Sequence, residues 1–257
     1  MISTKKIFNK KNKKPIVCLT AYSQNIAKIA DKYCDIILVG DSLGMVLYGM
    51  KTTRDVKIDT IILHARTVKN FTKKSLVVFD MPYKTYTNRF IAYKNAKKVM
   101  KLTKCDAIKL EGGVKIVNII KYLVKKGIPV MGHIGLLPQT SNKFKVKGIN
   151  HNQRKQILKD ALAISKSGAF AIVIECVVEN LAKKITKNVS IPTIGIGASK
   201  YCDGQILVTE DMLGLSNSLP KFVKQYANLN NVIEKCIKNY AKDVKMKRFP
   251  SHKNTYK

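Results

Sequence analysis

The chain has 257 residues, 46% hydrophobic and 25% charged, a balance that argues against intrinsic disorder. Its 48 Lys and Arg against 16 Asp and Glu give a formal net charge of +32, which is typical of nucleic-acid or membrane-surface binders. Only five of these cations are arginines, the side chain that nucleic-acid recognition favours, so we interpret the charge as a solvated lysine-rich surface and expect no specific nucleic-acid partner.

The six cysteines contain no CxxC pair and no zinc-ligand spacing, and a disulfide framework is not expected in a chain of this length. The first residues, Met1–Pro15, are polar and basic and lack the apolar region of a secretory signal. No stretch has the about 18 apolar residues that a bilayer span requires. We therefore expect a reduced, soluble, cytoplasmic protein with no membrane partner.

Short and almost continuously apolar runs predict strands that are buried on both faces, as in a parallel sheet. Amphipathic stretches with helical spacing lie between them, for example over 58–68 and 157–165, and Gly127 and Gly168 are suited to end helices. The predicted strands are Ile16–Tyr22, Asp35–Asp41, Leu76–Pro82, Ala107–Gly112, Pro129–Gly135, Phe170–Cys176, Pro192–Ala198 and Gly204–Thr209.

Eight such strands with helical connections predict an α/β protein, a (β/α)8 TIM barrel. The alternative is an open doubly wound sheet, which normally carries a glycine-rich phosphate loop after its first strand. Leu19–Tyr22 contains no glycine, so the barrel is favoured. We expect one domain over 1–257, with a basic N-terminal extension over about 1–14 and a C-terminal helical tail over about 221–257.

Ionisable residues gather at the predicted strand ends, which meet at one mouth of a barrel. Taken singly, each has a structural interpretation: Asp41 and Ser42 as helix caps, Asp80 as a turn former, His133 as a core histidine, Lys109 and Glu111 as an ion pair. Taken together these interpretations weaken, because several buried ionisable groups in one place are costly unless a ligand or a metal compensates them.

Three carboxylates from adjacent strands, Asp41, Asp80 and Glu111, form an all-oxygen set that favours Mg²⁺ over zinc. Lys109 beside them supplies a cation for an anionic substrate, and Glu175, from across the barrel, is free to act as a general base. Such a site suits proton removal next to the carbonyl of a 2-oxo acid, with the metal stabilising the enolate.

Five ordered motifs closely resemble the 3-methyl-2-oxobutanoate hydroxymethyltransferase (ketopantoate hydroxymethyltransferase) family. The resemblance covers nearly the whole chain from about Pro15. The motifs are Ile37–Met45, Ile108–Gly113, Gly132–Leu136 followed by Pro138 and Gln139, Ile194–Ala198, and Cys202–Gln205.

The resemblance implies a barrel of the phosphoenolpyruvate/pyruvate superfamily and a one-carbon transferase of the EC 2.1.2 type. It implies transfer of a hydroxymethyl group from 5,10-methylenetetrahydrofolate to 3-methyl-2-oxobutanoate, giving 2-dehydropantoate in the first committed step of pantothenate biosynthesis. Carried over by motif, Asp41, Asp80 and Glu111 would hold Mg²⁺. The oxo acid would be bound by Asp41, Ser42, Asp80 and Lys109, with Glu175 as proton acceptor and His133 as a supporting residue. Family members are similar in forming homodecamers.

One segment departs from the family pattern. Thr140–Gly148 is shorter than usual, and we expect folate binding or loop closure to be affected there. The sequence argues against two other functions. A carbon–carbon lyase on the same metal-dependent barrel usually carries a Lys-Cys-Gly loop, which is absent here. A nucleic-acid-binding protein would have clusters rich in arginine and aromatic residues, which are also absent.

Overall fold

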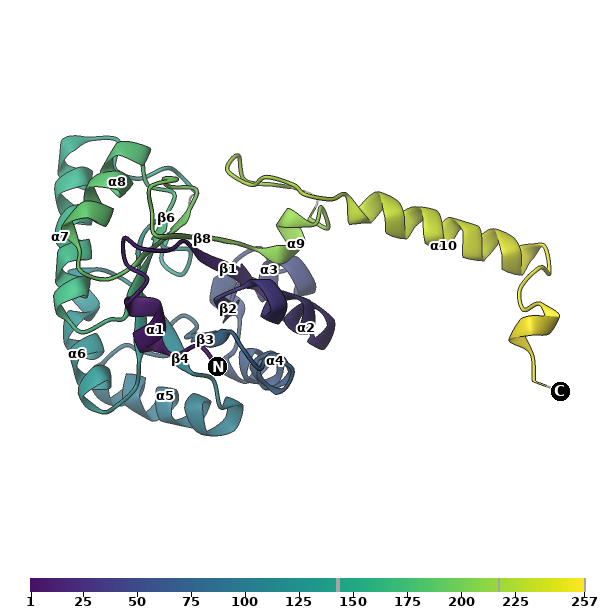
Figure 1. Ribbon diagram of the computed structural model, residues 1–257, viewed down its shortest axis with the longest axis horizontal. Helices are drawn as coiled ribbons and strands as arrows, with labels where there is room; N and C mark the ends of the chain where they lie inside the picture. Colours follow the sequence, from purple (N-terminus) through teal and green to yellow (C-terminus); the bar gives the residue numbers. More distant parts are fainter. Residues whose placement is uncertain (142–143, 217, 257) are drawn as a thin grey trace. The chain divides into compact units, whose positions relative to one another are not determined.

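Eight parallel strands close into a barrel in the computed structural model of the chain, with β1 to β8 following one another in chain order (Figure 1). The structure describes residues 1–141, 144–216 and 218–256. These residues form two compact units, one over 1–208 and one from Thr209 onward. The predicted (β/α)8 barrel is confirmed, and the open sheet is wrong because β1 pairs in parallel with β8.

Each strand lies within one of the runs predicted from sequence. The runs are apolar because both faces of each strand are covered, one by the barrel interior and the other mainly by helices. The strands are β1 Ile16–Thr20, β2 Ile36–Val39, β3 Leu76–Asp80, β4 Ala107–Glu111, β5 Val130–Gly135, β6 Ala171–Glu175, β7 Thr193–Ile196 and β8 Gly204–Leu207.

The helices of the barrel follow the strands as the amphipathic patterns predict, and the predicted stretches 58–68 and 157–165 fall inside α4 and α7. Gly127 and Gly168 adopt φ values of +79° and +92° after α6 and α7, which confirms them as helix terminators. The α-helices are α1 Thr4–Phe8, α2 Gln24–Tyr33, α3 Leu43–Tyr48, α4 Ile58–Asn70, α5 Arg89–Thr103, α6 Val117–Lys125, α7 His151–Lys166, α8 Glu179–Asn188, α9 Thr209–Met212 and α10 Leu229–Lys245. Short 3₁₀ turns are η1 Thr53–Asp55, η2 Val114–Ile116 and η3 His252–Asn254.

Side chains alternate between the two faces of each strand, so neighbouring residues belong to two different hydrophobic clusters. In β2, Ile36 and Leu38 belong to the cluster inside the barrel, whereas Ile37 and Val39 pack in the larger cluster that also holds helix residues. The interior rows are apolar at the N-terminal ends of the strands. They become polar at the C-terminal ends, and this change positions the candidate site.

The N-terminal end of the barrel is closed by α1. The side chain of Ile7 in this helix is fully buried, and it packs in the interior cluster with Ile16, Ile36 and Phe170. Ser3 caps this helix by accepting a hydrogen bond from the backbone N–H of Lys6. The segment predicted as a basic extension therefore contributes a core residue as well as lysines.

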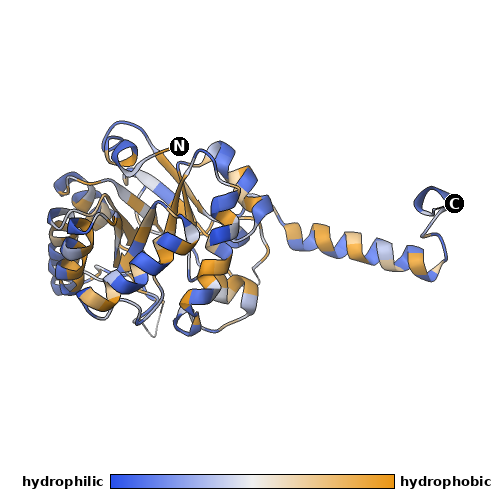
Figure 2. Cartoon of the chain, turned by 90° about the horizontal axis from the view of Figure 1, so that it is seen from below, coloured by the Kyte–Doolittle hydropathy of each residue, from blue (hydrophilic) through white to orange (hydrophobic). Residues whose placement is uncertain are grey.

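The second unit contains α10, a helix of 17 residues with no buried side chain. Ile233, Ile237 and Tyr240 follow helical spacing and are 46%, 61% and 58% exposed, so the helix carries an apolar stripe (Figure 2). Among the described residues, no helix is both long enough and apolar enough to cross a membrane.

Candidate active site

The polar residues singled out at the strand ends meet at the C-terminal end of the barrel. Asp80, Lys109 and His133 each follow an interior apolar position by two residues, and Glu111 follows Lys109 at the same spacing. All four are buried, as is Asp41 in the turn after β2. The structure therefore brings together the predicted metal-binding carboxylates, the predicted lysine and the predicted supporting histidine.

Lys109 is the cation of the cluster. Its Nζ lies 2.8 Å from Oδ1 of Asp80 and 3.9 Å from Oε1 of Glu111, so the ion pair expected within β4 is weaker than the pair formed across to β3. Although burial alone would lower the pKa of Lys109, the surrounding carboxylates raise it above its ordinary value. Lys109 is therefore charged at neutral pH.

Asp41 and Ser42 do not cap the helix that follows them. Ser42 has helical backbone angles and makes no side-chain capping bond to α3; its Oγ lies 2.7 Å from the hydroxyl of Tyr22 instead. Oδ2 of Asp41 accepts a hydrogen bond of 2.8 Å from Nε2 of Gln139. The capping interpretation is therefore wrong, and both side chains are available to the mouth of the barrel.

His133 lies between the lysine and Glu175. Burial, and then the charge of Lys109, lower the pKa of His133 to about 4, so the ring is neutral near pH 7. Nδ1 lies 3.2 Å from Nζ of Lys109, which can only donate, so Nδ1 accepts. The proton is therefore on Nε2, which lies 2.9 Å from the carbonyl oxygen of Leu136.

Glu175 ends β6 and is set apart from the other carboxylates. Its Oε2 lies 3.3 Å from Nε2 of His133, and its side chain is 14% exposed. Burial raises the pKa of Glu175 to about 7, with Lys109 opposing the shift. A carboxyl group with such a pKa exchanges protons readily at neutral pH, which is the property of a general base.

The backbone around Glu175 is unusual on both sides. Cys176 has a φ of +49°, a left-handed conformation that is rare for a residue with a side chain. Gly135, which pairs with Glu175, has a φ of +93°, and a Cβ there would collide with the carbonyl oxygen of Glu175. Glycine is therefore required beside the candidate base.

Two residues of the cluster had no role predicted from sequence. Gln139 is fully buried, and Tyr86 donates a hydrogen bond of 2.5 Å to its Oε1. Gln139 stands in one of the family motifs, whereas nothing in the sequence around Tyr86 distinguishes it. Both come from segments between a strand and a helix, where sequence periodicity carries no information about side-chain direction.

The charge of the cluster bears on metal binding. With Asp41, Asp80 and Glu111 ionised, three negative charges face the single positive charge of Lys109, an excess of two. Burial and the neighbouring carboxylates raise the pKa of Asp41, and burial raises that of Glu111.

The donor set fits a hard divalent cation. Such an ion would neutralise the excess charge, and oxygen atoms are its preferred ligands. Oδ1 of Asp80 lies 2.8 Å from Nζ of Lys109 and has no further partner among the described residues, so it can take a second ligand. In the described ranges no three His, Cys, Asp or Glu side chains converge as a ready metal-ligand group, and the assignment of ligands stays a prediction.

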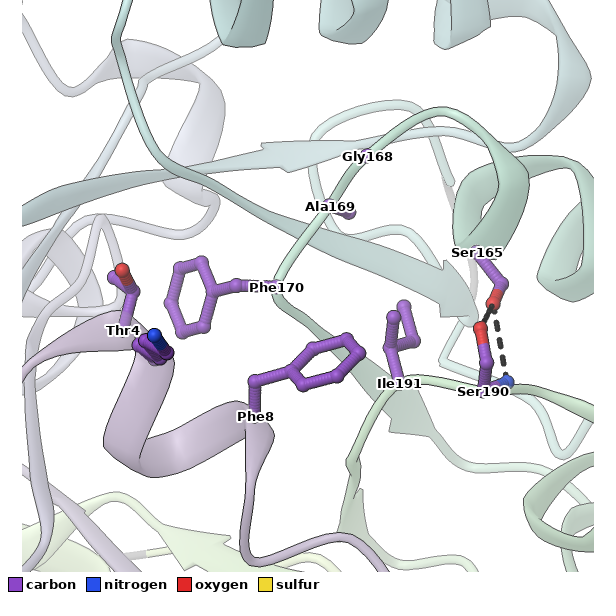
Figure 3. Close-up of a pocket in the computed structure, with 9 residues that line it drawn as sticks. Thr4, Phe8, Ser165, Gly168, Ala169, Phe170, Ser190 and Ile191 are labelled. Atoms are coloured by element: carbon purple, nitrogen blue, oxygen red, sulfur yellow. Dashed lines mark hydrogen bonds between the residues drawn. The ribbon is translucent and has the colours of Figure 1, made fainter.

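Shallow pockets are found elsewhere on the barrel. One lies beside α1 at the N-terminal ends of β6 and β7, where the ring of Phe8 points toward Ile191 and the ring of Phe170 toward Thr4 (Figure 3). Ser165 and Ser190, which are hydrogen-bonded at 3.0 Å, line its edge.

The segment predicted to affect folate binding, Thr140–Gly148, includes residues 142 and 143, which lie outside the described part of the chain. Of the rest, Lys147 is held by its backbone, donating to the carbonyl oxygen of Cys176 at 2.7 Å and accepting from Val178 at 3.0 Å. Phe144 and Val146 are exposed. This segment thus runs beside the backbone that follows Glu175.

Comparison with known proteins gives a consistent result over the full length. A family model described as ketopantoate hydroxymethyltransferase matches residues 1–252. The 3-methyl-2-oxobutanoate hydroxymethyltransferase of Pelagibacter ubique is 52% identical, with 98% of this chain and 99% of that protein covered. The protein of the same name from Anaplasma marginale is 47% identical over 96% of this chain and 90% of its own.

Solved structures with similar folds are much less similar in sequence. A phosphonopyruvate hydrolase crystallised with oxalate and Mg²⁺ superposes with a TM-score of 0.65 at 11% identity, covering 99% of this chain and 93% of the other. For 2,3-dimethylmalate lyase, a member of the PEP mutase/isocitrate lyase superfamily, the TM-score is 0.63 at 11% identity, with coverage of 99% and 89%. At such identities the likeness establishes the fold, which is the barrel type predicted from sequence.

Proposed function

The chain belongs to the ketopantoate hydroxymethyltransferase family, and from this premise we propose that it transfers a hydroxymethyl group from 5,10-methylenetetrahydrofolate to 3-methyl-2-oxobutanoate in a Mg²⁺-dependent reaction, giving 2-dehydropantoate. Membership of this family supports the hydroxymethyl transfer itself. The metal, the folate donor and the enolate route are parts of the proposal, and the arrangement of the buried side chains supports them.

We propose that Asp41, Asp80 and Glu111 hold the cation. Bound there, Mg²⁺ would supply the positive charge that stabilises the enolate of the oxo acid. The burial of three carboxyl groups in one place and the capacity of Oδ1 of Asp80 for a second ligand support this assignment.

Lys109, Asp41, Ser42 and Asp80 would bind the oxo acid. Lys109 keeps its charge, so it attracts the substrate carboxylate into a site that is otherwise acidic. The hydroxyl of Ser42 is oriented by Tyr22 at 2.7 Å and can donate to or accept from a substrate oxygen.

Glu175 would remove the proton from C3 of the oxo acid. Its pKa of about 7 is the single observation that carries this role, since at neutral pH about half of such groups are ionised and the carboxylate is more basic than an ordinary one. Nε2–H of His133 points to the carbonyl of Leu136 and to Glu175, so the neutral ring would orient the base without competing for the proton.

A deuterium-exchange experiment tests this proposal without the folate. The protein is incubated with 3-methyl-2-oxobutanoate and Mg²⁺ in deuterated water, and loss of the C3 proton is followed by NMR. We expect enzyme-dependent exchange that stops when a chelator removes the metal. Exchange no faster than in buffer, or exchange that the chelator does not affect, would contradict the proposal.

We also propose a single barrel domain with a C-terminal helical tail and a homo-oligomeric assembly, a decamer by family resemblance. The exposed apolar stripe of α10 supports self-association, because apolar surface of this kind is normally covered. Sedimentation velocity or mass photometry measures the assembly directly, and a monomer at micromolar concentration would contradict it.

A further inference from the structure

Gln139, in the turn after β5, is hydrogen-bonded to two of the carboxylates of the candidate site through its side chain and its backbone. Its Nε2 donates to Oδ2 of Asp41 at 2.8 Å and to the carbonyl oxygen of Met81 at 3.0 Å. Its backbone N–H donates to Oε2 of Glu111 at 3.1 Å. One residue thus binds two of the three carboxylates, from β4 and from the turn after β2.

The orientation of the Gln139 amide is fixed by its surroundings. Oε1 accepts the 2.5 Å hydrogen bond from the hydroxyl of Tyr86, and that hydroxyl in turn accepts from the backbone N–H of Glu111 at 3.3 Å. A flipped amide would place Oε1 against the Asp41 carboxylate and the Met81 carbonyl, two acceptors, and would leave Tyr86 facing a donor. The network therefore permits a single orientation, with the N–H groups toward Asp41.

The turn that contains Gln139 also contacts the candidate base, Glu175, and its neighbour His133. The backbone N–H of Leu136 donates to the carbonyl oxygen of Glu175 at 2.8 Å, and the carbonyl of Leu136 accepts from Nε2 of His133. Over four residues, 136–139, the chain passes from Glu175 to the carboxylate cluster. The position of Gln139 is thereby tied to that of the candidate base.

We propose that Gln139 is a positioning residue, which holds the Asp41 and Glu111 carboxylates in the arrangement that binds the cation and the oxo acid. Hydrogen bonds to metal-ligating carboxylates fix their orientation, and their loss typically lowers metal affinity 10- to 100-fold. The burial of Gln139 strengthens the case, because a buried amide with both of its donors in use cannot turn away. This inference rests on the proposed function.

Direct binding measurements test the role of Gln139 separately from activity. Mn²⁺ is the probe, followed by EPR, and binding of 3-methyl-2-oxobutanoate to the Mn²⁺-loaded protein is followed by calorimetry. Gln139→Met keeps the length of the side chain and removes its polar atoms. We expect Mn²⁺ affinity to fall about 10- to 100-fold, and oxo-acid affinity to fall with it.

A matched control separates positioning from a general loss of stability. Ser75 is also fully buried, and its hydroxyl donates to the carbonyl of Cys34 at 2.7 Å at the N-terminal end of β3, away from the carboxylates. Ser75→Ala therefore removes a buried hydrogen bond without touching the site. We expect it to lower Tm while leaving Mn²⁺ affinity unchanged.

Tyr86→Phe is a second variant, and it tests the inference even if Gln139→Met does not fold. It removes the hydroxyl that holds the amide, so Mn²⁺ affinity should fall, by less than in Gln139→Met. In the double variant the two effects should be smaller than their sum, since both act through one amide.

The outcomes are distinguishable. Mn²⁺ affinity within roughly threefold of the parent in both Gln139→Met and Tyr86→Phe would overturn the inference alone, since that is well below the usual effect. A parent protein that binds no Mn²⁺, or binds it equally well after Asp80→Asn, would overturn the proposed function and the inference with it.

Discussion

Nε2 of His133 lies 3.3 Å from Oε2 of Glu175, and this side-chain contact joins the candidate base to the carboxylate–lysine cluster. The other ring nitrogen faces Lys109, so a neutral imidazole separates a permanent cation from a carboxyl group that titrates near neutrality. This separation keeps Glu175 from forming a direct ion pair with Lys109. A direct pair would lower its pKa and make it a weaker base.

The first prediction concerns the base itself. Glu175→Gln keeps the size of the side chain and removes its ability to accept a proton. We expect C3 exchange to slow by at least about a hundredfold, the usual contribution of a general base, with Mn²⁺ and oxo-acid affinities nearly unchanged. Glu179→Gln, on the exposed start of α8, is the matched control and should exchange at the parental rate. A rate within a few-fold of the parent in Glu175→Gln would show that another group removes the proton.

The second prediction concerns the shared ligand. Asp80→Asn should weaken Mg²⁺ and oxo-acid binding together, because we assign this carboxylate to both, and titration calorimetry measures each affinity. Asp59→Asn removes an exposed carboxylate that pairs with Lys98 at 2.7 Å and should change neither. Unchanged oxo-acid affinity in Asp80→Asn would rule out the shared site.

The third prediction follows from the pKa of Glu175, which rises from 4.5 to about 7 on folding. The folded state then holds the proton more tightly than the unfolded chain. Glu175 stabilises the protein fully below about pH 4.5, and this contribution is lost as the pH rises through about 7. Glu175→Gln has no proton to lose, so between about pH 4.5 and pH 8 the metal-free variant should gain up to about 3 kcal/mol over the parent.

Urea denaturation of both proteins at a series of pH values measures this difference in unfolding free energy. Glu179→Gln, which changes an exposed glutamate in the same way, is measured over the same interval as the matched control. A constant offset for Glu175→Gln would mean that the folded protein does not raise the pKa of Glu175.

The fourth prediction concerns the charge of +32. If it is a solvated surface, binding to random duplex DNA rests on counterion release and should disappear steeply as salt is raised. Gel-shift titrations at low and near-physiological ionic strength, with a scrambled competitor, measure this. Tight sequence-dependent binding at the higher salt would contradict it, because only matched contacts survive screening.

Much of this molecule could be predicted from its sequence, since the relevant signals are local. Each strand is a short run that is apolar on both faces, and each predicted site residue stands where such a run ends. Asp80, Lys109 and Glu111 are therefore found from chain position alone, given a barrel.

What could not be predicted depends on contacts between distant segments. Gln139 and Asp41 are 98 positions apart, and no periodicity relates them. Ser42 matches the composition of a helix cap, but its backbone is already helical and its hydroxyl bonds to Tyr22. Ile7 lies in a basic segment with little apolar character, and its burial depends on the open end of a barrel that later residues build.

Among the described lysines, Lys109 is the one whose side chain is buried. Most of the other described lysines are exposed, and a substitution at such a position usually changes the stability by less than about 0.5 kcal/mol. Lys11 and Lys69 are exceptions, because each is largely buried against a carboxylate. A lysine added inside the barrel would lack a partner and would cost far more. The strands of the barrel therefore divide the chain into two environments. A lysine that replaces a residue on the solvent side changes the stability little, whereas one that replaces an interior residue buries a charge without a partner.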